Sequence, residues 1–135
     1  MPDLAERALA AADTIVVVGL STHEHKEAHA IPAAMQAAGY RMIPVHPSAA
    51  EILGERAYRS LDDVTESVDI VNVFRPAAEA PGIARQAVRI GAKALWLQQG
   101  IVSEEARSIA EQAGLDYVED RCMGVVRAVA GLRKN

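Results

Sequence analysis

Short, mostly apolar runs alternate along the chain with longer stretches of helical spacing. The runs lie at residues 15–18, 42–45, 68–74, 94–97 and 116–118, and many of their side chains are β-branched. Runs without an alternation of apolar and polar positions are typical of strands that are covered on both faces. The pattern therefore predicts a buried parallel sheet.

Between these strands, apolar residues recur every three or four positions, as in helices that bury one face. The predicted helices span residues 4–12, 27–38, 76–90, 103–113 and 125–132. The long crossovers between strands suit parallel pairing. We expect a Rossmann-like, doubly wound α/β fold, in which a parallel sheet of five or six strands has helices on both faces.

The stretch from residue 48 to residue 67 has a less regular pattern. Ser48 is placed to cap a short turn of helix that runs to Leu53 and is closed by Gly54. Residues 57–59 predict a brief edge strand, and residues 61–64 predict another helical turn.

The composition limits the class of protein. The 135 residues suffice for one domain, which we expect to span residues 1–135 without a linker or repeat. Half of the residues are apolar and only 4% are aromatic, which favours an aliphatic α/β core over a β-sandwich. The net charge of −4 argues against a general nucleic-acid or membrane-surface binder.

The compartment can be inferred from the cysteine content and the first residues. Cys122 is the one cysteine, which excludes an intramolecular disulfide and is compatible with a reducing compartment. The amino-terminal residues lack the basic region and apolar stretch of a signal peptide, and no apolar run is long enough to span a membrane. We therefore expect a cytoplasmic protein.

The first predicted strand ends at Gly19, and a helix follows soon after. Ser21 or Thr22 is placed to cap this helix, and Lys26 adds a positive charge near its start. A strand, a glycine turn and a helix N-terminus together can hold a phosphate. Polar or charged residues also follow the later strands, at positions 46, 75, 98–99 and 121. All strand exits of a parallel sheet share one edge, so we predict a binding site there.

Two common nucleotide-binding motifs are absent. Gly19 is not followed by the other glycines of Gly-x-Gly-x-x-Gly, and the second strand ends at His46 rather than at the acid that bonds an NAD ribose. A P-loop is also absent. The glycine turn with Ser21 and Lys26 suits a phosphate but predicts no catalysis.

Several segments, in this order and spacing, resemble those of the small stand-alone CoA-binding proteins. They are Val-Val-Gly-Leu-Ser, Lys-Glu-Ala-His, Ile-Pro-Val-His-Pro, Val-Asp-Ile-Val-Asn-Val-Phe-Arg, Gly-Ala-Lys-Ala-Leu-Trp-Leu-Gln-Gln-Gly-Ile-Val and Asp-Arg-Cys-Met. This family is similar to the CoA-binding N-terminal domain of succinyl-CoA synthetase, and the resemblance covers residues 10–123. It implies a Rossmann-like fold that binds coenzyme A or an acyl-CoA, without an established catalytic role.

The resemblance also implies which residues contact CoA. Those expected to face the pyrophosphate are Gly19, Leu20, Ser21 and Lys26. Those expected beside the adenosine are Val45, His46 and Pro47. Those expected along the pantetheine are Phe74, Arg75, Gln98, Gly100 and Ile101, with Cys122 near the far edge of the cleft. The chain departs from the usual family pattern at His46, at Glu27 and over residues 124–135.

Some of these residues have simpler explanations. Lysines early in surface helices are usually solvated, which is the alternative for Lys26. Arg75 is equally placed to cap a helix or to pair with an acid. Trp96 lies between two leucines of a strand, so we interpret it as a core or interface residue.

Histidines and the cysteine invite further hypotheses. His25 and His29 stand four residues apart, as metal ligands on one helix face do, but no zinc motif surrounds them, and we predict no metal site. Cys122 is interpreted as a buried, inert cysteine. The alternative is that Arg121 favours its thiolate, which then forms a mixed disulfide with the CoA thiol.

Three classes of function are compatible with these features. The first is a non-catalytic module that binds CoA or an acyl-CoA. The second is a CoA-dependent ligase or transferase subunit that acts with another chain, and the third is an NAD(P)-sensing regulator. We favour the module, because the chain has no second domain with a phosphorylatable histidine or a base. We assign no catalytic residue, and either a homodimer or a partner enzyme is compatible with the apolar residues 125–132.

Overall fold

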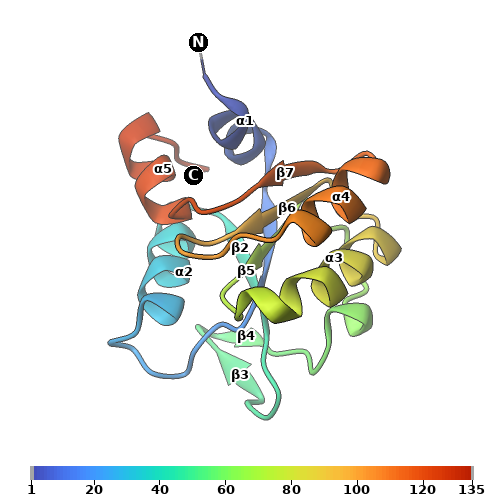
Figure 1. The fold of residues 1–135 in the computed structure, drawn as a ribbon. Coiled ribbons are helices and arrows are strands. Elements are labelled where there is room, and N and C mark those ends of the chain that lie inside the picture. The colour runs from blue at the N-terminus through green and yellow to red at the C-terminus, as the bar shows by residue number, and fades with distance from the viewer. Residues whose placement is uncertain (1, 135) are drawn as a thin grey trace.

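The computed structural model describes residues 2–134, and a five-stranded parallel sheet forms its centre (Figure 1). The strands are β1 (Thr14–Val18), β2 (Arg41–Val45), β5 (Ile70–Val73), β6 (Ala94–Leu97) and β7 (Asp116–Val118). Their order in the sheet is β2-β1-β5-β6-β7. The chain thus extends the sheet first to one side of β1 and then, from β5 onward, to the other. The predicted Rossmann-like α/β fold is confirmed.

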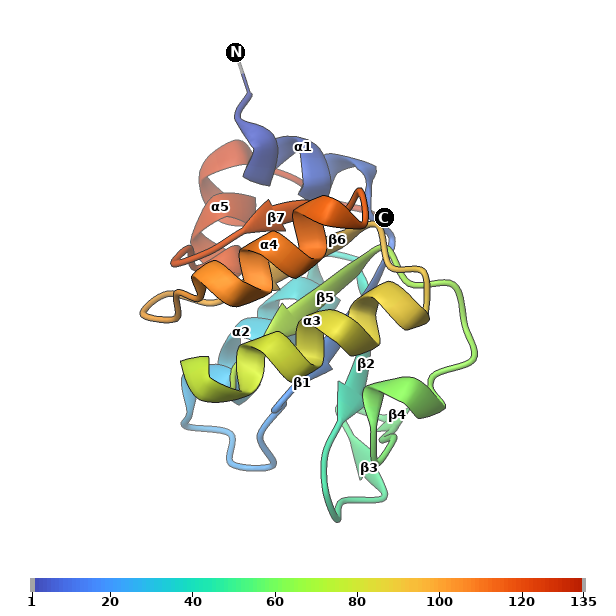
Figure 2. The ribbon, with the colours of Figure 1, turned by 45° about the vertical axis from the view of Figure 1, so that its right-hand side comes forward.

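Helices cover both faces of the sheet (Figure 1; Figure 2). They are α1 (Leu4–Ala11), α2 (Glu27–Ala37), α3 (Ala80–Arg89), α4 (Glu104–Gln112) and α5 (Met123–Ala130). Helices α3 and α4 pack together on one face, while α1 and α2 both contact α5 on the other. None of the described helices is both long and apolar enough to cross a membrane.

The side chains of β1 alternate between two cores. Val16 and Val18 belong to the cluster beneath α3 and α4, whereas Ile15 and Val17 belong to the cluster beneath α1, α2 and α5. All four are buried, which explains why the strand has no polar position. Trp96 of β6 is fully buried in the second cluster, so its interpretation as a core residue is confirmed.

The C-terminal helix docks on its own chain. Met123 and Val126 of α5 are buried against the second face of the sheet. Val125 and Val129, by contrast, are 59% and 81% exposed. Intramolecular docking thus covers only part of the apolar surface of this helix.

The prediction for residues 48–54 is wrong. Instead of a helical turn, this segment contributes to an antiparallel hairpin of β3 (Glu51–Ile52) and β4 (Glu55–Arg56). The two turn residues, Leu53 and Gly54, have φ values of 58° and 75°. A turn with two positive φ angles suits a tight hairpin and excludes a right-handed helix.

The other irregular connections follow the predictions more closely. Tyr58 forms a single parallel bridge with Val45, so residues 57–59 extend the edge of the sheet beside β2. A 3₁₀ turn, η1 (Leu61–Asp63), lies at the predicted helical turn. A second 3₁₀ turn, η2 (Ala77–Glu79), precedes α3, whose regular part begins only beside Pro81.

Candidate functional site

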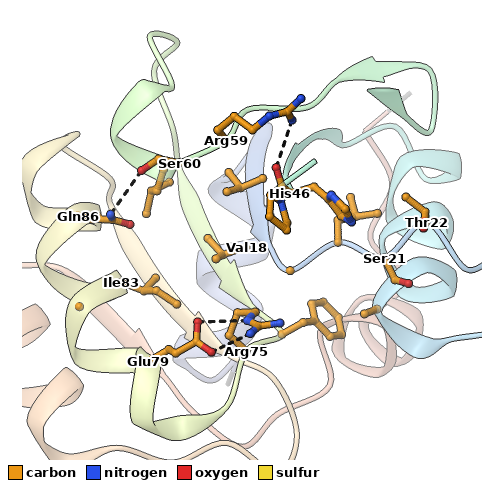
Figure 3. A pocket seen from close by; sticks show the side chains of 18 of the residues that line it. Val18, Ser21, Thr22, His46, Arg59, Ser60, Arg75, Glu79, Ile83 and Gln86 are labelled. Carbon is orange, nitrogen blue, oxygen red and sulfur yellow. Dashed lines mark hydrogen bonds and ion pairs between the residues drawn. The ribbon is translucent and has the colours of Figure 1, made fainter. Parts of the chain in front are cut away.

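A cleft of about 1040 Å³ opens at the carboxyl ends of β1, β2 and β5. These strands flank the point where the strand order reverses, which is where doubly wound sheets bind ligands. Figure 3 shows Val18 and His46 at the end of the sheet and Ile83 and Gln86 facing them from α3. Nine predicted residues line the cleft: Gly19, Leu20, Ser21, Lys26, Val45, His46, Pro47, Phe74 and Arg75.

Gly19 begins the turn that leads from β1 towards α2. Its φ is +96°, and its N–H donates to the Val45 carbonyl at 3.2 Å. The N–H of Ser21 donates to the Ala28 carbonyl at 3.0 Å, and the Ser21 carbonyl lies 2.8 Å from His29 Nδ1. These contacts hold the turn against the first residues of α2, so both lie at the cleft.

The predicted capping of α2 by Ser21 or Thr22 is wrong. The N-cap residue is Lys26, whose side chain makes no capping bond. The Ser21 hydroxyl instead accepts the N–H of His23 at 3.0 Å, because the loop folds back on itself before the helix begins. The N–H of Ala28, a cleft residue, has no acceptor among residues 2–134. A free N–H in the first turn of a helix favours an anion.

Positive charge is concentrated in the cleft although the whole chain is negatively charged. Five cationic side chains line it: Lys26, Arg59, Arg75, Arg85 and Arg89. Glu79 is the one carboxylate in the lining described here. Such a local excess of positive charge attracts an anionic ligand.

The five cations differ in their partners. Three form ion pairs: Arg75 with Glu79 at 2.8 Å, Arg85 with Glu105 at 3.0 Å, and Arg89 with Asp62 at 2.9 Å. The hydrogen bonds from Arg89 lower the pKa of Asp62, so this pair stays charged at neutral pH. Lys26 and Arg59 have no carboxylate within 4.0 Å among the described residues. These two are therefore the cations whose charge is available to a ligand.

His46 has a defined tautomer at the end of β2. Its Nδ1 accepts the N–H groups of Ser48 at 3.1 Å and Ala49 at 2.9 Å. A ring nitrogen that accepts hydrogen bonds carries no proton, so the proton of the neutral ring is on Nε2. His46 thus offers a donor at the cleft, whereas an acid at this position would offer an acceptor.

Sequence reasoning missed one side of the cleft, which α3 and the segment before η1 provide. Ser60, Ile83 and Gln86 line it, and Gln86 Nε2 donates to Ser60 Oγ at 3.5 Å (Figure 3). The residues of α3 that line the cleft are Gly82, Ile83, Arg85, Gln86 and Arg89. Their spacing of three and four residues marks one helix face, and this signal could have been found from the sequence.

Four predicted residues lie outside this cleft. Gln98 is buried, and its Oε1 accepts the N–H of Met123 at 3.4 Å. Gly100 and Ile101 are held by the loop after β7. Gly100 N–H donates to Asp120 Oδ1 at 2.7 Å, and Asp120 N–H donates to the Ile101 carbonyl at 3.2 Å. These bonds join the exit of β6 to that of β7, away from the cleft. Contact of Gln98, Gly100 and Ile101 with a ligand therefore stays a prediction.

Cys122, the fourth of these residues, lines a second, smaller cavity of about 360 Å³ beside α5. It is half-buried. The neighbouring Arg121 directs Nη1 to Asp3 Oδ2 at 3.3 Å. Because Cys122 does not line the cleft, the cleft gives no support to the hypothesis that its thiol forms a mixed disulfide with the CoA thiol.

The histidines near α2 do not gather around a common point. The rings of His23 and His25 lie 5.8 Å apart, and His29 contacts the Ser21 carbonyl. Within residues 2–134, no group of three His, Cys, Asp or Glu side chains is placed to hold a metal ion. The groups at the cleft that can bind a ligand are therefore its cationic side chains and its backbone N–H donors.

The fold and cleft define a Rossmann-like α/β domain with a positively charged cleft, and comparison with known proteins gives its family. Residues 13–128 match the family described as a CoA binding domain, and the chain belongs to this family. The predicted relation to the CoA-binding proteins is confirmed.

Three relatives illustrate the range of similar proteins. The uncharacterized protein YneT of Bacillus subtilis is 42% identical over 115 residues, which cover 85% of each chain. A solved structure from Thermus thermophilus is 35% identical with a TM-score of 0.89, covering 96% of this chain and 98% of that one. The ADP-forming acetate–CoA ligase of Methanocaldococcus jannaschii is 22% identical over 121 residues. The match covers 84% of this chain but only 17% of the ligase, so the chain is related to one part of a CoA ligase.

Proposed function

We propose that this chain binds coenzyme A or an acyl-CoA in the cleft at the ends of β1, β2 and β5. The observation that carries the proposal is a positively charged cleft at the reversal of strand order in a member of the CoA binding domain family. Its volume of about 1040 Å³ is large enough for a nucleotide with an extended arm.

The proposed orientation follows the donors in the cleft. The N–H of Ala28 and the ammonium group of Lys26 would hold the pyrophosphate beside the Gly19 turn, because they supply a free N–H donor and a positive charge. The N–H groups of Gly19 and Ser21 already donate to the Val45 and Ala28 carbonyls. The adenosine would lie beside His46 and Pro47, and the pantetheine would leave past Phe74.

We propose a binding module rather than an enzyme. The one carboxylate in the described lining, Glu79, is held by two hydrogen bonds from Arg75 and is poorly placed to act as a base. The similarity to one part of an acetate–CoA ligase supports a second candidate, in which the module serves a catalytic partner chain.

A thermal-unfolding scan with CoA, acetyl-CoA, NAD, NADP and ATP tests the ligand. A ligand at about one hundred times its Kd stabilises the folded state by about 2.7 kcal/mol, which raises Tm by about ten degrees in a domain of this size. We expect this shift with CoA compounds. A shift with NAD or NADP but none with CoA would contradict the proposal and favour the nicotinamide-sensing alternative.

A further inference from the structure

Arg59 lies at the edge of the cleft because Tyr58 pairs with the last residues of β2. Tyr58 N–H donates to the Pro44 carbonyl at 2.9 Å, and the Tyr58 carbonyl accepts the N–H of His46 at 2.9 Å. These two bonds fix the backbone directly before Arg59. The position of this arginine is therefore set by the sheet, although its side chain is exposed.

Backbone carbonyl groups anchor one side of the Arg59 guanidinium group. Its Nη1 donates to the Ala49 carbonyl at 2.6 Å. It also donates to the His46 carbonyl at 3.3 Å (Figure 3). Nε and Nη2 have no acceptor among the described residues. The anchor is uncharged, so the arginine is oriented while its charge and two nitrogens stay available.

The end of β2 is where a doubly wound domain holds the ribose of an adenine nucleotide. An acid there bonds free ribose hydroxyl groups, whereas an arginine nearby accommodates a phosphate on the ribose. This cleft has His46 with an Nε2 donor at that position, and its one described carboxylate, Glu79, is paired with Arg75. The donors at the end of β2 thus suit a phosphorylated ribose.

We propose that Arg59 selects ligands whose ribose carries a phosphate monoester, and that it distinguishes CoA, which has a 3′-phosphate, from dephospho-CoA. This inference rests on the proposed function. The cleft then has two separate anion positions. One is at the Gly19 turn and Lys26 for the pyrophosphate, and the other is at Arg59 for the monoester.

Titration calorimetry with CoA and with dephospho-CoA tests this assignment on the full chain. The variants are Arg59→Gln, which removes the charge, and Arg59→Lys, which keeps it without the planar donors. Arg56→Gln is the matched control, because Arg56 is an exposed arginine three residues away that does not line the cleft. NADP and NAD provide a second pair of ligands that differ by a ribose phosphate. The ratio of the two Kd values within one variant cancels any loss of folded protein.

We expect the unmodified chain to bind CoA about tenfold more tightly than dephospho-CoA. Arg59→Gln should bring this ratio to about one, Arg59→Lys should give an intermediate value, and Arg56→Gln should leave it unchanged. CoA binding with a ratio that Arg59→Gln does not change would overturn the role of Arg59 alone. Binding of neither CoA compound would overturn the proposed function and this assignment with it. Preference for NADP over NAD, with equal binding of the two CoA compounds, would overturn the choice of CoA as ligand.

Discussion

Gly19 and Arg75 are packed so closely that only a glycine fits at position 19. A Cβ atom placed on Gly19 would lie 2.9 Å from Arg75 Cδ and 3.2 Å from the Phe74 carbonyl oxygen. The backbone of the turn after β1 therefore packs directly against the Arg75 side chain and the Phe74 carbonyl at the exit of β5. This contact places the turn beside an arginine of the cleft.

We expect Gly19→Ala to destabilise the fold and to weaken CoA binding. The alanine would adopt a φ of +96° and would also push Arg75 aside, at a cost of about 2–3 kcal/mol in the free energy of unfolding. Gly91→Ala is the control, since Gly91 has a φ of +75° with no atom near its Cβ position. It should lose only about 1 kcal/mol in the free energy of unfolding, the cost of the left-handed conformation alone. If urea denaturation gives the same loss in the free energy of unfolding for Gly19→Ala and Gly91→Ala, the contact with Arg75 contributes nothing to stability.

Lys26→Gln should weaken CoA and dephospho-CoA equally, because both ligands carry the pyrophosphate. A charge-assisted contact at this exposed position corresponds to about a tenfold change in Kd. The affinity of the variant should also depend less on salt, since one screened charge is removed. Lys93→Gln is the control, because Lys93 pairs with Asp69 at the amino-terminal edge of the sheet. A loss confined to CoA would place Lys26 at the 3′-phosphate instead.

Gln98→Leu tests whether Gln98 supports the fold or contacts the ligand. Its Oε1 accepts Asn72 Nδ2 and the N–H of Met123, both at 3.4 Å. Leucine would leave two buried donors without this acceptor and should lower the free energy of unfolding by about 2 kcal/mol. We expect the Kd for CoA to stay the same, whereas the family resemblance predicts that it rises. Gln99→Leu, at an exposed neighbour, should leave stability nearly unchanged.

Tyr40→Phe should make the fold less sensitive to high pH. Burial raises the pKa of Tyr40, whose hydroxyl donates to the Leu9 carbonyl at 2.9 Å. The folded chain then holds the phenolic proton more tightly than the unfolded chain does. Stability from this group is complete below a pH of about 10 and is lost as the pH rises above it.

The measurement is the free energy of unfolding between pH 8 and about pH 11.5. Tyr40→Phe should cost about 1 kcal/mol at pH 8 through the lost hydrogen bond and should give a shallower decline above pH 10. Tyr58→Phe is the control, since the Tyr58 hydroxyl donates to no described residue. If the free energy of unfolding of Tyr40→Phe falls above about pH 10 as steeply as that of the unmodified chain, the Tyr40 hydroxyl is not the group responsible. Tyr117, whose pKa is also raised by burial, would then be the next residue to test.

The layers of the fold could be predicted because their signals are local. The run Ile15–Val18 has no polar residue, since both of its faces are covered, and Gly39 ends α2 with a φ of +99°. The Ser103 side chain caps α4 as predicted, by accepting the N–H of Ala106 at 3.1 Å. Each of these signals depends on a few neighbouring residues, so the sequence carries it directly.

The hairpin at residues 51–56 could not be predicted in the same way. Its strands have two residues each, too few to show a period, and its turn requires a positive φ at Leu53, a residue that rarely adopts one. The resemblance to CoA-binding proteins indicated the family. It did not predict that residues 57–59, which follow the hairpin, place Arg59 at the end of β2.

By itself, the sequence determined that buried strands alternate with helices, that a glycine turn follows the first strand, and that the strand exits share one edge. Tertiary structure alone decided which exits form the cleft. The exits of β1, β2 and β5 open towards α3, whereas those of β6 and β7 bind each other through Asp120. The physical reason is that the order of apolar and polar residues in a strand determines which of its faces are buried. The direction of the loop that follows the strand depends instead on hydrogen bonds to segments distant in the sequence.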